Sequence, residues 1–366
     1  MSLFSKKQPE LGPSPIEGKV VVLADLDGVV YAGPGAIPHA VESLNAVAEH
    51  TRVGYITNNA SRTAASVAGH LRELGLSCSD EDIVSSPQAA MHLLAELVEP
   101  GSTILVIGGE GLTYELEKNG YVVTFSAEDN PAAVIQGFSP DVGWKQLAEA
   151  SFALNARPTA DAFGGTAPGA GETAGIPWVA TNMDWTIPVA RGVAPGNGTL
   201  VSAVHTAVGR LPVVAGKPEL PIFDEAARRF GTAAAPETAL FIGDRLDTDV
   251  MGGNRAGMKT VLVLTGIDQA KQLLAAPVGS RPDYILNDLR ELSEPYPAVI
   301  TNKDGSVTVR GATVRKDGMN LTIVSRGENK LDLLRAACQV IWDSGFAIFG
   351  FTVPEELYSR VNIVTQ

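Results

Sequence analysis

Two acidic residues follow the first apolar run of the sequence. Lys19–Ala24 (K-V-V-V-L-A) is nearly continuous in apolar residues, which is typical of a buried parallel strand leading into a functional loop. Asp25-Leu26-Asp27-Gly28 comes directly after it. Two carboxylates one residue apart at a strand end can share a Mg²⁺ ion, which prefers hard oxygen ligands. We therefore expect a metal at this strand end, with a third carboxylate from elsewhere in the chain.

Three further segments supply the groups that such a site needs. Asp244 follows the apolar run Ala239–Ile242, Thr57 follows a second run, and Lys217 lies in a Gly-Lys-Pro segment. A Thr hydroxyl and a Lys ammonium can bind phosphate oxygens. Each signal alone has an ordinary explanation, since Asp-x-Asp-Gly is also a surface turn or a calcium loop and Gly-Lys-Pro is also a turn. Their joint occurrence, each after an apolar run, favours a phosphate site.

The elements around these segments alternate between strands and helices. The chain begins in strand, helix, strand, helix order, with helices at Pro38–Glu49 and Ser61–Leu74 around the strand Arg52–Thr57. Further strands are expected at Ile104–Ile107, Tyr121–Phe125, Ala133–Gln136, Trp178–Thr181, Ala239–Ile242 and Thr260–Leu264, and further helices at Gln88–Leu97, Leu112–Asn119 and Leu220–Phe230. This alternation predicts a doubly wound, Rossmann-like α/β core, in which functional groups gather at the carboxyl ends of the strands.

The ordered set of motifs resembles the haloacid dehalogenase superfamily, whose four motifs match Asp25/Asp27, Thr57, Lys217 and Asp244/Asp249 over about residues 19–292. The resemblance implies that Asp25 attacks phosphorus and that Asp27 protonates the leaving alkoxide and later activates water. It also implies that Mg²⁺ binds Asp25, the Asp27 carbonyl and Asp244. An acid at position 27 points to a phosphatase or phosphomutase and away from the related phosphate-transferring pumps.

Charge balance explains why the other motif residues are needed. An aspartate that attacks a phosphate dianion meets repulsion, which a metal and Lys217 can offset at contact range. Thr57 and Asn58 are expected to complete the phosphate cradle. Asp249 is expected to hold metal-bound water or Lys217 in place.

The spacing of the motifs predicts the domain organisation. The stretch from Thr57 to Lys217 is far longer than one helix and one strand, so an α/β cap that contributes specificity is expected at residues 87–210. The catalytic core is then residues 19–86 and 211–294. Residues 1–18 are expected to form a disordered arm, and residues 295–366 a small α+β domain with a dimerisation or regulatory role, which would suit a homodimer. In this last domain a hairpin is expected at Val307–Val309 and Leu321–Val324, a helix at Leu331–Trp342 and a strand at Phe346–Thr352.

Cap segments extend the resemblance to a branch of small-molecule phosphatases. Ala-Thr-Asn-Met-Asp at residues 180–184 and Pro-Gly-Asn-Gly at 195–198 resemble segments of actinobacterial glycerol 3-phosphate phosphatases. Glycerol 3-phosphate is therefore the expected substrate, with phosphoglycolate, pyridoxal phosphate, sugar phosphates and nucleotides as alternatives. Candidate substrate contacts, each of which could equally serve a loop hydrogen bond or surface ion pair, are Arg62, Asn182, Asp184, Arg191 and Asn197. The Gly/Pro/Ala-rich segment Asn155–Gly175 is expected to be a mobile surface loop inserted in the cap.

The composition of the chain disfavours some classes of binding partner. The formal charge of −13 repels nucleic acid and anionic lipid at long range. A phosphate site must therefore be formed by positively charged side chains, backbone N–H groups and a metal close to the phosphate. No apolar run approaches the ~20 residues of a membrane span, and the two cysteines, Cys78 and Cys338, lack metal-ligand spacing. A small phosphorylated metabolite and a cytoplasmic location are expected.

Three other classes of protein share parts of the pattern. A dinucleotide-binding protein has the same rhythm of strands and helices, but no Gly-x-Gly-x-x-Gly follows the first strand. A phospho-signalling receiver uses Asp, Thr and Lys around Mg²⁺ but has no use for a cap. A regulatory protein without catalytic activity stays an alternative, because a sequence does not show whether an enzyme turns over substrate.

Overall fold

The computed structural model describes residues 11–155, 175–189 and 191–359. The chain divides into two compact units, one formed by Met1–Gly54 with Gly231–Gln366 and the other by Tyr55–Phe230. None of the helices in the described ranges combines the length and apolar character that a bilayer crossing needs. Residues 1–10 of the predicted arm lie outside the described residues. For residues 11–18 the prediction of disorder is wrong, because Leu11 pairs with Pro297 and the Gly12 N–H donates to the Tyr296 carbonyl.

The first unit contains a parallel sheet whose buried strands are the predicted apolar runs. Its order is β15 (Tyr284–Leu286), β14 (Lys259–Val263), β13 (Ala239–Gly243) and β1 (Val21–Asp25). Every residue of β1 and β13 is buried, as expected for strands covered on both faces. The helices of this region are α1 (Ala40–Ala48), α8 (Met251–Arg255) and α9 (Ala270–Leu274), and a short hairpin joins β2 (Tyr31–Ala32) to β3 (Gly35–Ala36).

The second unit begins within β4 (Arg52–Thr57), which carries the chain from one unit into the other. β4 pairs in parallel with β5 (Ile83–Ser85), a three-residue strand that follows α2 in the chain. The helices α2 (Ala64–Glu73), α3 (Ser86–Leu97) and α7 (Leu220–Phe230) confirm the predicted helices to within two or three residues. The Thr63 side chain caps α2 by accepting from the Ser66 N–H.

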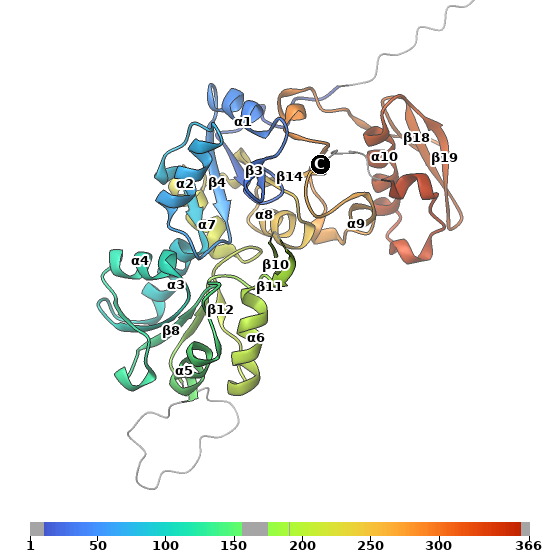
Figure 1. Cartoon of the computed structure of the whole chain (residues 1–366). Coiled ribbons are helices and arrows are strands. Elements are labelled where there is room, and N and C mark those ends of the chain that lie inside the picture. Colours follow the sequence, from blue (N-terminus) through green and yellow to red (C-terminus); the bar gives the residue numbers. More distant parts are fainter. Residues whose placement is uncertain (1–10, 156–174, 190, 360–366) are drawn as a thin grey trace, which may run out of the picture. The chain divides into compact units, whose positions relative to one another are not determined.

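A second parallel sheet lies wholly within the second unit. Its order is β12 (Val213–Val214), β9 (Trp178–Ala180), β8 (Ala133–Gln136), β6 (Thr103–Ile107) and β7 (Val122–Thr124). α5 (Trp144–Asn155) and α6 (Asn197–Val208) pack on one face and share an apolar core with β6, β8 and β9, while α4 (Glu110–Lys118) follows β6 (Figure 1). An antiparallel hairpin joins β10 (Thr186–Val189) to β11 (Gly192–Pro195). Of the predicted loop Asn155–Gly175, residues 156–174 lie outside the described residues.

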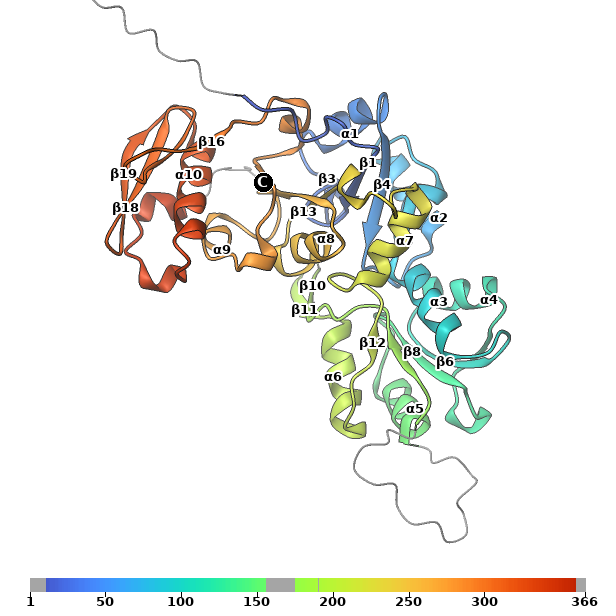
Figure 2. The same ribbon diagram turned by 180° about the vertical axis from the view of Figure 1, so that it is seen from behind.

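The C-terminal region is α+β, as predicted. β16 (Val299–Thr301), β17 (Val307–Val309), β18 (Ala312–Asp317) and β19 (Asn320–Arg326) form an antiparallel sheet with α10 (Lys330–Asp343) against it (Figure 2). The strand expected at Phe346–Thr352 is wrong. This segment contains a short 3₁₀ helix, and within it only Thr352 pairs, with Asn320. The N–H groups of Gly350 and Phe351 donate to carbonyls three residues back, at Ala347 and Ile348, so local turns take up the backbone groups that a strand would offer to a neighbour. The dimerisation or regulatory role of this region stays a prediction.

A buried arginine joins this region to the parallel sheet of the first unit. Arg335 on α10 is 3% exposed. Its guanidinium donates to the Ile285 carbonyl of β15 at 3.1 Å and pairs with Asp332 and Glu291, both at 2.9 Å. It also lies over the Tyr296 ring at 4.6 Å from the centroid. The N–H donors of the Arg335 guanidinium therefore have acceptors on several sides, which a buried charge needs in order to be stable.

Candidate active site

Three buried carboxylates meet at the carboxyl ends of β1 and β13. Asp25 is the last residue of β1, and Asp244 directly follows β13. These strands are parallel neighbours, with Ala24 opposite Ile242, so their ends lie at the same edge. Asp249 comes from the single π-helical turn Leu246–Val250 that follows. One oxygen of each carboxylate lies within 4.8 Å of the other two, and all three residues are buried.

Backbone groups orient two of these carboxylates. Asp249 Oδ2 accepts from the N–H groups of Asp244 and Arg245, both at 3.1 Å. Asp244 Oδ2 accepts from the Ile267 N–H at 2.7 Å. The nearby Asp268 donates its N–H to the Asp244 carbonyl, and burial raises the pKa of its carboxyl despite the hydrogen bond from the Leu246 N–H. The loops after β13 and β14 therefore hold the acidic group in one arrangement.

Glycines leave the space that Asp244 occupies. An added Cβ would lie 2.3 Å from Asp244 Oδ2 at Gly28 and 1.9 Å from the same atom at Gly266, both far inside van der Waals contact. Gly28 also has φ 83°, a left-handed conformation that favours glycine. The Thr265 hydroxyl donates to the Gly28 carbonyl at 2.7 Å, which ties the two loops together. Sequence reasoning missed Gly266, although the Thr-Gly pair directly after an apolar run is a recognisable strand-end signal.

This acidic group fits a divalent cation. Three buried carboxylates this close repel one another, and a bound cation relieves the repulsion. Oxygen ligands in a compact group are the set that Mg²⁺ prefers. The residues predicted as metal ligands, Asp25 and Asp244, are both in the group, together with Asp249. Asp27 is exposed beside it, with its side chain outside the group.

The predicted phosphate-binding residues of the second unit also lie together. Thr57 ends β4 and is 2% exposed, and Lys217 is 4% exposed. Asn58 connects them, because it follows Thr57 and its Oδ1 accepts from the Lys217 N–H at 2.8 Å. The Thr57 hydroxyl oxygen accepts from the Asn59 N–H at 3.1 Å, which shapes the turn.

The candidate substrate contacts divide into two kinds. Asn182, Asp184 and Asn197 form a buried or half-buried hydrogen-bonded set: Asn197 Nδ2 donates to the Asn182 carbonyl at 2.8 Å, and Asp184 Oδ1 accepts from Asn58 Nδ2 at 3.1 Å. For these three the loop hydrogen bonds are present. Arg62 and Arg191 are exposed, the first before α2 and the second in the turn between β10 and β11.

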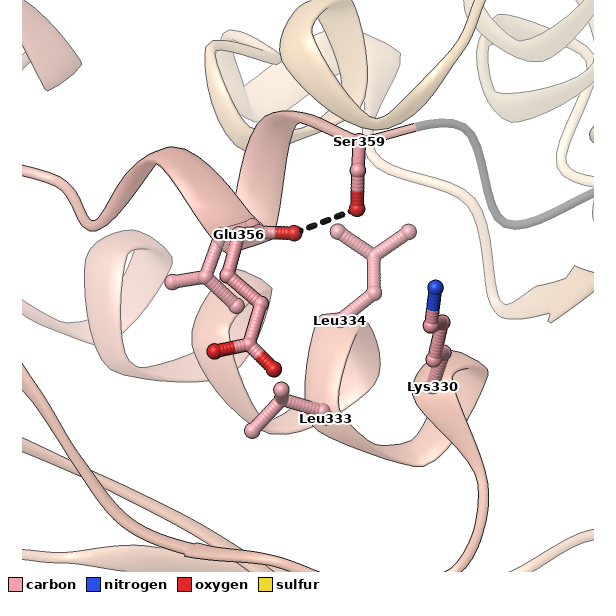
Figure 3. A pocket seen from close by; sticks show the side chains of 6 residues that line it. Lys330, Leu333, Leu334, Glu356 and Ser359 are labelled. Atoms are coloured by element: carbon pink, nitrogen blue, oxygen red, sulfur yellow. Dashed lines mark hydrogen bonds between the residues drawn. The ribbon is translucent and has the colours of Figure 1, made fainter.

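A recess near the end of the described chain offers a poorer candidate site. Its lining includes Lys330 and two leucines of α10 together with Glu356 and Ser359, whose hydroxyl donates to the Glu356 carbonyl (Figure 3). Its volume of about 10 Å³ suits a single water molecule. A phosphorylated metabolite does not fit there.

Comparison with known proteins points to one family. The pattern of the haloacid dehalogenase-like hydrolases matches residues 22–122, and a HAD-hydrolase-like pattern matches residues 214–292. The chain is 39% identical to D-glycerol 3-phosphate phosphatase of Mycobacterium tuberculosis over 88% of this chain and 86% of that protein. It is 32% identical to 5′-nucleotidase YutF of Bacillus subtilis over 74% of this chain and 95% of that protein.

A solved structure agrees with the sequence matches. The crystal structure of a glycerol phosphate phosphatase from Mycobacterium tuberculosis in complex with magnesium superposes with a TM-score of 0.80 and 36% sequence identity. The match covers 94% of this chain and 97% of that one. It therefore extends across both units and includes the C-terminal region.

Proposed function

The chain belongs to the haloacid dehalogenase-like hydrolase family and is a phosphoric monoester hydrolase; from this premise we propose that it hydrolyses glycerol 3-phosphate to glycerol and phosphate with Mg²⁺ as cofactor. The observation that carries the proposal is the buried group of Asp25, Asp244 and Asp249 at the strand ends. The likeness to the mycobacterial enzyme over nearly the whole chain supports the choice of substrate.

In the proposed reaction Asp25 is the nucleophile. One of its carboxylate oxygens attacks phosphorus, so a bond from Asp25 to phosphorus forms while the bond from phosphorus to the glycerol oxygen breaks. Asp27 gives its proton to that oxygen, and glycerol leaves. Asp27 then takes a proton from water, whose oxygen attacks phosphorus, which releases phosphate and restores Asp25. The exposure of Asp27 beside the buried Asp25 suits a group that exchanges protons with water.

The remaining residues are proposed to manage charge. Asp25, the Asp27 carbonyl and Asp244 would hold the cation, which would supply positive charge that lowers the repulsion between the nucleophile and the phosphate. Thr57 and Lys217 bind phosphate oxygens, and Asp249, with its carboxylate anchored by two N–H groups, keeps the loop after β13 in place. The low exposure of Lys217 strengthens its attraction for phosphate, because less water screens the charge.

Steady-state kinetics test the substrate. The values of kcat/KM are compared for glycerol 3-phosphate, phosphoglycolate, pyridoxal phosphate and a nucleoside monophosphate, with Asp25→Asn as the blank for contaminating activity. We expect glycerol 3-phosphate to be preferred, because the chain is similar over 88% of its length to the mycobacterial D-glycerol 3-phosphate phosphatase. A clear preference for the aromatic or nucleotide ester would refute this substrate while leaving the phosphatase chemistry intact.

A further inference from the structure

The Asn58 side chain bonds to the backbone on both sides of Lys217. Its Oδ1 accepts from the Lys217 N–H at 2.8 Å, and its Nδ2 donates to the Lys217 carbonyl at 3.2 Å. Both bonds are buried. The side-chain amide thus pairs with Lys217 as a strand backbone would, which fixes the backbone from which the ammonium projects. A side chain engaged in this way is not available as the phosphate ligand expected from the sequence.

Asp184 reinforces the orientation that the Lys217 backbone gives to the Asn58 amide. Its two carboxylate oxygens lie 3.1 and 3.2 Å from Asn58 Nδ2. A carboxylate only accepts and the Lys217 N–H only donates, so Nδ2 must face Asp184 and Oδ1 must face Lys217. A flipped amide would place oxygen against carboxylate and N–H against N–H. The hydrogen bond to a charged acceptor is also stronger than one between neutral groups.

Contacts from neighbouring loops also fix the backbone of Asn58 and the segment before Lys217. Asn182 Nδ2 and the Ser86 hydroxyl both donate to the Asn58 carbonyl, at 2.7 and 2.8 Å. An added Cβ at Gly216 would lie 2.5 Å from Asn58 Oδ1 and 2.5 Å from the Thr181 carbonyl, so the segment before Lys217 passes as close as glycine allows. The segment is positioned by side chains that come from three parts of the sequence.

We propose that Asn58 and Asp184 are positioning residues for Lys217. Asp184 reinforces the orientation of the Asn58 amide, and the amide holds the Lys217 backbone so that the ammonium meets the phosphate. The inference rests on the proposed phosphate-binding role of Lys217. It gives Asp184 a task in the reaction that involves no contact with substrate, in place of the substrate contact expected from the sequence.

The experiment measures kcat, KM, the inhibition constant of inorganic phosphate and Mg²⁺ affinity for Asp184→Ala, Asp184→Asn and Lys217→Ala. Asp82→Asn is the matched control, since Asp82 is half-buried in the same unit and accepts hydrogen bonds from Ser79. We expect Asp184→Ala to raise the phosphate inhibition constant and lower kcat by about tenfold each, because small misplacements of a reacting group are costly. Asp184→Asn keeps an acceptor and should recover most of the loss.

The outcomes separate positioning from folding. A merely structural loss would reduce the active fraction, and with it kcat and the stoichiometry of Mg²⁺ binding, but would leave the phosphate inhibition constant unchanged. The proposal is overturned if Lys217→Ala weakens phosphate inhibition while Asp184→Ala does not, or if Asp82→Asn weakens it equally. If Lys217→Ala itself leaves phosphate inhibition unchanged, both the role of Lys217 and this inference fail.

Discussion

Gly28→Ala should weaken metal binding without altering any carboxylate. The new methyl group would lie 2.3 Å from Asp244 Oδ2 and 2.6 Å from its Cγ, so the carboxylate must move by about 0.7 Å to reach 3.0 Å. Mg²⁺ tolerates little deviation from ligand distances of roughly 2.0–2.1 Å, so a shift of this size detaches the ligand. We expect Mg²⁺ affinity to fall at least about tenfold, which corresponds to ~1.4 kcal/mol.

Backbone strain adds a separate cost that a second glycine isolates. An alanine at φ 83° costs about 1–2 kcal/mol of folding stability. Gly33 has φ 60° in the same loop region, and an added Cβ there meets nothing within 4 Å, so Gly33→Ala carries the strain without the clash. In urea unfolding without metal, Gly28→Ala should lose at least as much stability as Gly33→Ala, because it adds the clash to the strain, and only Gly28→Ala should lose Mg²⁺ affinity by calorimetric titration. Equal Mg²⁺ affinities of the two variants would refute the reasoning.

Three further outcomes are expected. Asp25→Asn should abolish Mg²⁺-dependent phosphate release with an unchanged circular dichroism spectrum, since the amide keeps the shape but not the nucleophile; activity within tenfold of wild type contradicts this. Asp244→Ala should weaken Mg²⁺ binding, whereas Lys217→Ala should chiefly weaken phosphate inhibition; unchanged Mg²⁺ affinity after loss of Asp244 would show the metal assignment to be wrong. Arg335→Ala should destabilise the protein by about 3–5 kcal/mol in urea, because it leaves buried Asp332 without this partner, while Arg315→Ala should have a much smaller effect, because water screens the ion pair of Arg315 with Asp317; similar losses would argue against the anchor.

The sequence predicted the elements whose apolar patterns are strong. The strand expected at Arg52–Thr57 and the helix expected at Leu220–Phe230 have the predicted ends. The strand has a continuous apolar run and the helix has clear amphipathic spacing, so in both the sequence pattern matches the side chains that the fold buries. The bounds of β5 could not be predicted, because a three-residue strand has too few positions to show a period. The prediction of a strand at Phe346–Thr352 is wrong because an apolar pattern does not distinguish a strand from a 3₁₀ turn, in which backbone N–H groups bond to carbonyls three residues back.

The candidate site shows the same division. Asp25 and Asp244 could be placed together from sequence, because parallel strand ends meet at one edge of a sheet. The link from Asn58 to Asp184 spans 126 positions and depends on how a loop approaches a strand end, which no local pattern encodes. The Thr-Gly pair marks a strand end in the sequence, but the role of Gly266 could not be predicted from it, because the space that this glycine leaves is filled by the side chain of the distant Asp244. The contacts that side chains make with loops far away in the sequence could therefore be identified only from the structure.

The buried contacts of Arg335 bear on how the molecule opens. One apolar core includes Leu262 of β14, Leu273 of α9 and Leu334 of α10, so the C-terminal helix and the edge of the parallel sheet bury each other. Groups that lose their burial together also open together. In native-state hydrogen exchange, the amides of α10 and of β15 should therefore belong to one cooperative opening unit, and the C-terminal region should behave as part of the first unit rather than as a removable appendage.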